Sequence, residues 1–193
     1  MLANLRALLG MVADIVRLKG GPENLPTSTA LLACVIGVFA VGTSIAAASV
    51  ATPEQQTWPI QVVVGIVVTL GWFHVALGLA KKRERFTQTM TALFAVRALF
   101  TPVVIPLVAT FRPYFAAAAA AADSASTTAA AVPAPSGALA ALVLFLTIWL
   151  LTIEVRIIRA AFEWPIAGAL FLVLMEEFAV VLVTGLLLAS ITG

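Results

Sequence analysis

Hydrophobic residues along the chain are grouped into five long runs separated by short polar connectors. A helix needs roughly 20 apolar residues to cross a hydrocarbon core of about 30 Å, because each residue advances it by about 1.5 Å. All five runs reach that length: Ser28 to Val50, Pro59 to Ala80, Thr87 to Thr110, Gly137 to Ile158 and Pro165 to Ile191. The pattern predicts an all-α, polytopic membrane helix bundle with five transmembrane helices.

The N-terminal segment has a different periodicity. Apolar residues recur there at three- and four-residue spacing, at Leu2, Leu5, Leu9, Val12 and Val16. Polar residues occupy the other faces, which is typical of an amphipathic interfacial helix. Such a helix either anchors the chain at the membrane surface or docks a partner, and the sequence leaves both open. We therefore expect a cytoplasmic amphipathic helix and entry loop in 1–27, followed by a single transmembrane domain in 28–193.

The composition also indicates an integral membrane protein. Of the 193 residues, 62% are apolar and 10% are charged, and the mean hydropathy is +1.11. Soluble domains are roughly half apolar and a quarter charged, so an ordinary soluble domain is excluded. Cys34 is the only cysteine in the sequence, which rules out an intrachain disulfide.

Basic residues gather on one predicted side of the membrane. This is the positive-inside pattern and not the basic face of a nucleic-acid-binding protein, so no nucleic acid partner is expected. The residues on that side are Arg6, Arg17, Lys19, Lys81, Lys82, Arg83, Arg85, Arg156 and Arg159. The pattern predicts a multi-pass protein of the bacterial inner membrane with a cytoplasmic N-terminus and a periplasmic C-terminus. The Ala-, Ser- and Pro-rich stretch 112–136 is then an external loop.

Three ionisable residues, Arg97, Glu176 and Glu177, lie about 15 to 17 Å inside their predicted spans. A charge at that depth costs about 2.5 to 3.5 kcal/mol, so it usually has a partner. We predict an ion pair between Arg97 and one of the two glutamates, while the other faces a second groove, lipid or a partner chain. The three residues either only lock helices together, form a proton or ion path, or form a catalytic pair.

His74 lies about 9 Å inside the second predicted span and is the remaining candidate for this intramembrane polar cluster. It either joins the glutamates as a metal ligand or proton relay, or is only hydrogen-bonded within the bundle. One histidine and two adjacent glutamates do not form a recognisable metal-binding pattern, so we predict no metal and no cofactor. Pro102 and Pro106 interrupt the third span, where a kink either opens a cavity above Arg97 or adapts the packing.

Four charged residues, Glu154, Arg156, Arg159 and Glu163, mark the cytoplasmic end of the fourth span. The last three share one helical face, from which long side chains can reach lipid headgroups. Glu154 lies deeper, where a carboxylate needs a partner. We interpret the group as a solvated helix end that contacts lipid phosphates.

The adjacent glutamates resemble those of the intramembrane CAAX-protease and bacteriocin-processing family. That family has an arginine after three further residues and a separate Phe-x-x-x-His motif, whereas this chain has Val181 and Leu70 at the two positions. The resemblance covers two residues and implies no catalytic role. Motifs for nucleophilic or metalloprotease chemistry are also missing from the sequence, so we do not expect an enzyme.

The layout of an amphipathic N-terminus and five closely spaced spans resembles bacterial membrane proteins of the Yip type. Residues 21–26, Gly-Pro-Glu-Asn-Leu-Pro, form an entry motif similar to that of small bacterial membrane proteins. The resemblance implies membrane organisation and partner binding. We therefore expect a non-catalytic accessory or scaffold subunit that associates with membrane lipids and with other integral membrane proteins or itself. The alternative is a small proton- or ion-coupled transporter or channel that uses Glu176, Glu177 and Arg97.

Overall fold

The computed structural model describes residues 2–50, 57–114 and 136–192. Within these ranges the helices are α1 (Leu2–Val16), α2 (Thr29–Val50), α3 (Trp58–Leu79), α4 (Phe86–Ala109), α6 (Gly137–Phe162) and α7 (Ile166–Thr192). Short 3-10 turns, η1 (Pro22–Asn24) and η2 (Arg83–Arg85), precede α2 and α4. Five of the described helices are long and apolar enough to cross a membrane, which confirms the predicted all-α multi-pass protein. Most of the predicted external loop 112–136 lies outside the described residues.

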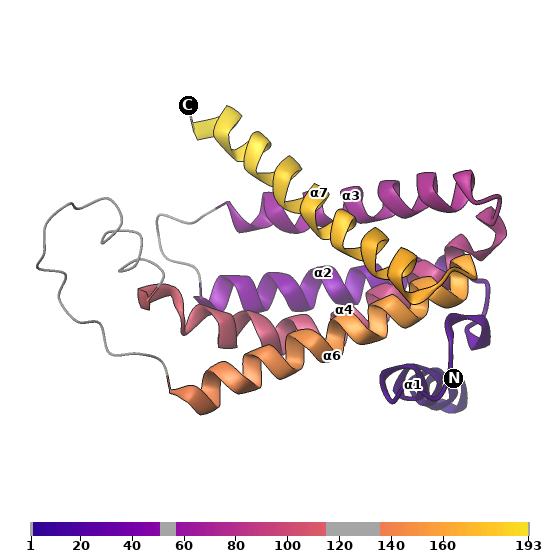
Figure 1. The fold of residues 1–193 in the computed structure, drawn as a ribbon. Coiled ribbons are helices and arrows are strands. Elements are labelled where there is room, and N and C mark those ends of the chain that lie inside the picture. Colours follow the sequence, from indigo (N-terminus) through magenta and orange to yellow (C-terminus); the bar gives the residue numbers. More distant parts are fainter. Residues whose placement is uncertain (1, 51–56, 115–135, 193) are drawn as a thin grey trace, which may run out of the picture.

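The helices form a bundle with α4 at its centre. Figure 1 shows α2, α4 and α6 running side by side, while α7 crosses α3 and diverges from the bundle toward the C-terminus. The α3–α4 turn, the α6–α7 turn and α1 lie together at one end. We call this the basic end, because the α3–α4 turn there carries Lys81, Lys82, Arg83 and Arg85.

Apolar side chains of α3, α4, α6 and α7 pack tightly in the half of the bundle nearest the basic end. All residues of α4 from Thr89 to Val96 are buried, as expected for a helix surrounded by others. The other large members of this core are Phe73, Leu77, Ile158, Phe162 and Val173. On the far half, Gly42 of α2 allows a close approach to Pro102 of α4, since a Cβ atom there would lie 3.3 Å from the proline Cγ. The apolar side chains of α3, α4, α6 and α7 therefore form one continuous core between the centre of the bundle and the basic end.

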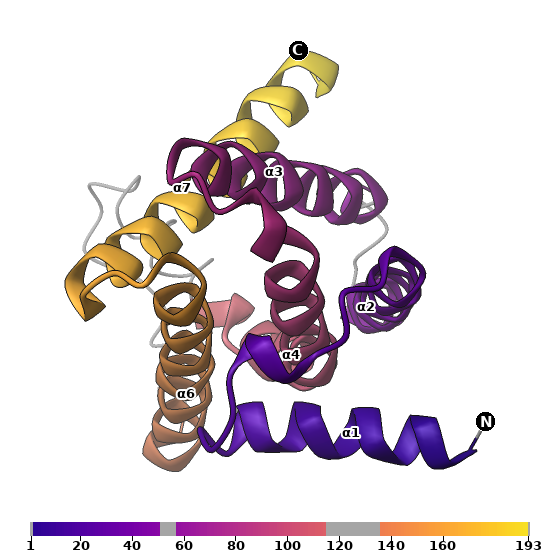
Figure 2. The ribbon, with the colours of Figure 1, turned by 90° about the vertical axis from the view of Figure 1, so that its right-hand side faces the viewer.

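Helix α1 lies across α4 and α6 at the basic end, roughly perpendicular to both (Figure 2). Its buried face overlaps the predicted one only in part: Val12 is 7% exposed as expected, but Leu9 is 56% exposed, and Ile15, which the predicted face did not include, is 3% exposed. The side chains of Leu2 and Leu5 lie outside the described part of the helix. Ile15 packs with Ile153 and Ile157 of α6, because the bundle itself offers an apolar surface to this helix. The interfacial position of α1 in a membrane stays a prediction.

We expect Ile15→Ala to lower the free energy of unfolding by about 2 to 4 kcal/mol, because it removes a buried side chain and leaves a cavity. Leu9→Ala is the matched control on the same helix, and its effect should stay within about 0.5 kcal/mol. Thermal unfolding of the two variants in mild detergent measures the difference. Equal losses would show that α1 is not docked through the Ile15 face.

The charges near the end of α6 are arranged differently from the prediction. Glu163 ends the helix in the left-handed conformation, with φ of 58°, so it leaves the face of Arg156 and Arg159. Its carboxylate pairs instead with Lys82 and with Arg85, whose Nη2 lies 2.6 Å away. Hydrogen bonds from Lys82 and Arg85 lower the pKa of Glu163. Arg156 donates to the Leu18 carbonyl at 2.5 Å and so ties the segment after α1 to α6, while Arg159 is exposed.

Candidate functional site

Arg97 is the centre of a polar cluster in the middle of the bundle. Its guanidinium contacts Thr69 of α3, Glu154 of α6, and Glu176 and Glu177 of α7. Counted along each helix from the basic end, these residues lie about 12 to 17 Å deep. We call these five residues the Arg97 cluster. Four helices thus bring costly polar groups to one level of an otherwise apolar bundle.

The guanidinium uses its planar donors to hold three carboxylates. Its Nε donates to Oε1 of Glu154 at 2.7 Å, while its Nη2 donates to Oε2 of Glu176 at 2.8 Å and to Oε1 of Glu177 at 2.9 Å. Further bonds to Glu154 at 3.3 Å and to Glu176 at 3.1 Å make both of those pairs two-pronged. Such pairs are stronger and more directional than single bonds. Arginine suits this position because it keeps its charge in lipid.

Thr69 completes the cluster and was not identified from the sequence. Its hydroxyl donates to Oε1 of Glu176 and accepts a bond from Nη1 of Arg97 at 3.2 Å. The sequence feature that indicates this residue is a single hydroxyl group at mid-depth in an otherwise apolar stretch of α3. Thr69 is 1% exposed, so this polar group has its partners inside the protein.

The side chains of the cluster differ in exposure, from the enclosed Glu176 to the accessible Glu177. The side chain of Glu176 is 0% exposed, Glu154 is 4% exposed and Arg97 is 12% exposed. The side chain of Glu177 is 53% exposed. Adjacent residues on a helix point about 100° apart, which explains how one glutamate is enclosed while its neighbour is accessible.

The structure brings together more residues than the sequence indicated. Arg97 contacts both Glu176 and Glu177, where one contact was predicted, and Glu154 joins them although it was grouped with the helix end. Glu154 lies deeper than that grouping implied, because α6 continues to Phe162. His74 does not join: it is exposed, and its ring packs edge-on against Phe86 at 5.2 Å. It follows Thr69 by five residues, a rotation of about 140° that turns it away from the cluster.

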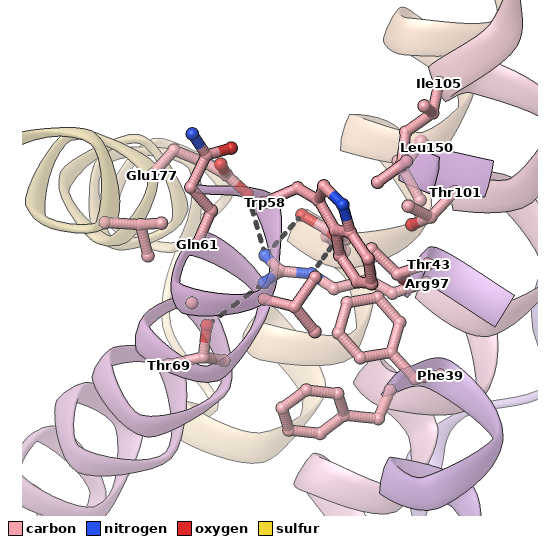
Figure 3. A pocket seen from close by; sticks show the side chains of 16 residues that line it. Phe39, Thr43, Trp58, Gln61, Thr69, Arg97, Thr101, Ile105, Leu150 and Glu177 are labelled. Atoms are coloured by element: carbon pink, nitrogen blue, oxygen red, sulfur yellow. Dashed lines mark hydrogen bonds and ion pairs between the residues drawn. The ribbon is translucent and has the colours of Figure 1, made fainter. Parts of the chain in front are cut away.

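A cavity of about 290 Å³ lies against the cluster on the side away from the basic end. Arg97, Glu154 and Glu177 form its floor, and the cavity extends to the first turn of α3 (Figure 3). The aromatic residues along it are Phe39, Trp58 and Phe94, and the uncharged polar ones are Thr43, Gln61, Thr69 and Thr101. Arg97, Thr101 and Ile105 line it from the stretch of α4 that contains Pro102. This is the location where the sequence suggested a cavity above Arg97.

The cluster carries more acid than base. One guanidinium faces three carboxyl groups, so full ionisation would leave two uncompensated negative charges away from bulk water. The site therefore favours uptake of positive charge, either a proton or a cation. Among the described residues no group of three or more His, Cys, Asp or Glu side chains is arranged to hold a metal ion.

Comparisons with protein-family models, with curated proteins and with solved structures found no match to the chain. The resemblance to Yip-type proteins stays a prediction.

Proposed function

We propose that the chain is a non-catalytic, multi-pass protein of the bacterial inner membrane that acts as a small proton- or cation-coupled transporter. The observation that carries this proposal is the Arg97 cluster at the floor of a cavity, where three glutamates share one arginine. A structural lock between helices needs one carboxylate per guanidinium. The surplus of carboxyl groups and the exposure of Glu177 favour a site that binds and releases protons or cations.

The positive-inside rule supports the orientation of this site. The basic end then lies in the cytoplasm, and the cavity faces the periplasm. The packed apolar core around Phe73, Leu93 and Phe162 lies between the cluster and the cytoplasm. We therefore interpret the arrangement as an outward-accessible state of a carrier, and not as an open channel. Conformational change would then have to open the basic half of the bundle.

Proton uptake into proteoliposomes tests the proposal. With an imposed membrane potential, we expect vesicles containing the protein to change their internal pH faster than empty vesicles. Glu177→Gln should reduce the rate to that of empty vesicles, because it removes the accessible acid group. Glu84→Gln, which changes an exposed glutamate in the α3–α4 turn, should have no effect. Transport is contradicted if the protein gives no flux, or if Glu177→Gln and Glu176→Gln both leave the flux unchanged.

A second candidate is the accessory or scaffold role that the Yip-type layout implies. The supporting observation is again Glu177, since a carboxylate that is 53% exposed at this depth can be covered by a basic residue of another membrane protein. Purification from native membranes in mild detergent tests this role. A partner that co-purifies with the unaltered chain and is lost from Glu177→Gln supports it. A lone monomer that retains no other protein contradicts it.

A further inference from the structure

Acidic, aromatic and hydroxyl groups line the cavity beside the Arg97 cluster, and its volume is close to that of a small-molecule site. Binding pockets for small molecules are mostly apolar, begin at about 300 Å³ and contain a few placed polar groups. This cavity has a volume of about 290 Å³, just below the lower limit of that range. Its dimensions suit a small molecule, and its side chains indicate the chemistry of that molecule.

The charged residues at the floor of the cavity favour a ligand that carries a positive charge. Glu177 is the accessible carboxylate of the cluster, and its single arginine partner is shared with two other glutamates. A cation that enters the cavity can therefore pair with Glu177 without displacing Arg97 from Glu154 and Glu176. An anion would meet three carboxyl groups around one guanidinium, and is disfavoured.

The walls of the cavity favour an organic cation. Phe39 and Phe94 pack with their ring centroids 5.3 Å apart at 59°, and Trp58 lines the same space (Figure 3). Aromatic faces attract ammonium groups and also cover the hydrocarbon part of an amine. A bare metal ion would gain little from these rings, and the carboxylates surround a guanidinium instead of an empty centre.

Thr43 gives an independent indication that the cavity accommodates a polar ligand group. The residue is 9% exposed, lines the cavity, and its hydroxyl has no hydrogen-bond partner. A helical threonine commonly bonds the carbonyl four residues earlier, as Thr89, Thr91, Thr147 and Thr152 do here. A buried polar group without a partner needs an explanation, and a ligand in the cavity supplies one.

From this combination we infer that the cavity binds a small organic cation with N–H groups, a primary amine. In this arrangement the charged nitrogen pairs with Glu177 and donates a hydrogen bond to the Thr43 hydroxyl, while the carbon part packs against Phe39, Phe94 and Trp58, all of which line the same cavity. The inference rests on the proposed function in that it names the solute which the transporter would carry.

Calorimetric titration of the purified protein with benzylamine tests the inference, with benzyl alcohol as the neutral analogue of the same shape. We expect benzylamine to bind and benzyl alcohol not to bind. Glu177→Gln should weaken benzylamine binding by about tenfold or more, since it removes a charged hydrogen-bond partner. Thr43→Val keeps the shape of the side chain and should also weaken binding. Glu84→Gln is the control and should bind as the unaltered protein does.

Three results would overturn the inference: no binding of benzylamine, equal binding of the amine and the alcohol, or binding that neither Glu177→Gln nor Thr43→Val weakens in variants that melt like the parent. Titration in phosphatidylglycerol nanodiscs, with and without phosphatidylethanolamine, distinguishes the source of the amine. Competition by the lipid assigns the site to its headgroup, and no competition assigns it to a free solute. Proton flux without amine binding would reject this inference alone, whereas amine binding without any flux would reject the transport proposal.

Discussion

Replacing Arg97 by leucine is expected to lower the free energy of unfolding by about 3 to 5 kcal/mol, the usual cost of removing one partner from a buried ion pair. The loss is large because Glu154 and Glu176 are almost completely enclosed, and Arg97 is the cation that pairs with both of them among the described residues. Thermal unfolding in mild detergent measures it. Arg159→Leu is the matched control, since Arg159 is an exposed arginine at the basic end, and it should change the stability little.

A double-mutant cycle separates this contact from a general loss of packing. Adding Glu176→Leu to Arg97→Leu should recover part of the lost stability, because the second change removes a carboxylate that the first leaves without its cation. The recovery should be partial, since Glu154 and Glu177 remain. If the losses from the two single changes simply add, the Arg97 contact with Glu176 does not exist.

The two adjacent glutamates are expected to respond very differently to the same substitution. Glu176→Gln should cost about 3 kcal/mol or more, because the new amide group would face the donors of Thr69 and Arg97 inside the protein. Glu177→Gln should change the stability by no more than about 1 kcal/mol, since its side chain is 53% exposed and Arg97 keeps its pairs with Glu154 and Glu176.

Unfolding of both variants in the same detergent provides the comparison. Each variant acts as the control for the other, because the two residues are neighbours and the chemical change is identical. A large loss for Glu177→Gln would mean that this side chain is covered, which contradicts its place as the accessible acid of the cavity. A stable Glu177→Gln variant also ensures that its transport and binding defects are not caused by unfolding.

The helices of this chain could be predicted from the sequence because hydrophobic runs of bilayer length allow few alternatives. Counting residues from the helix ends also placed Arg97, Glu176 and Glu177 at one depth. It failed for Glu154, because the predicted fourth span ended at Ile158, four residues before the end of α6. Counted from Ile158, the Glu154 carboxylate is only four residues from the helix end, and it is therefore grouped with the charges there.

Features that depend on how helices face each other could not be obtained from one sequence. The prolines of α4 suggested a cavity above Arg97 but not what lines its other side: Phe39 and Thr43 of α2 line it together with Arg97 and Thr101 of α4, and nothing in the periodicity of either helix indicates that pairing. The same applies to α1, whose buried face was chosen from apolar spacing alone. Leu9 fits that spacing as well as Ile15 does, and the surface of α4 and α6 decides between them.

Arg97 also sets an order of events during synthesis of the chain. Its carboxylate partners follow it by 57, 79 and 80 residues, in α6 and α7. Helix α4 must therefore enter the bilayer carrying an arginine for which no carboxylate partner has yet been made, at a cost of about 2.5 to 3.5 kcal/mol. The strongly apolar remainder of α4 has to offset that cost until α6 and then α7 supply the carboxylates. A ribosome stalled after α4 should thus yield a helix that leaves the membrane more readily than the same helix in the finished protein.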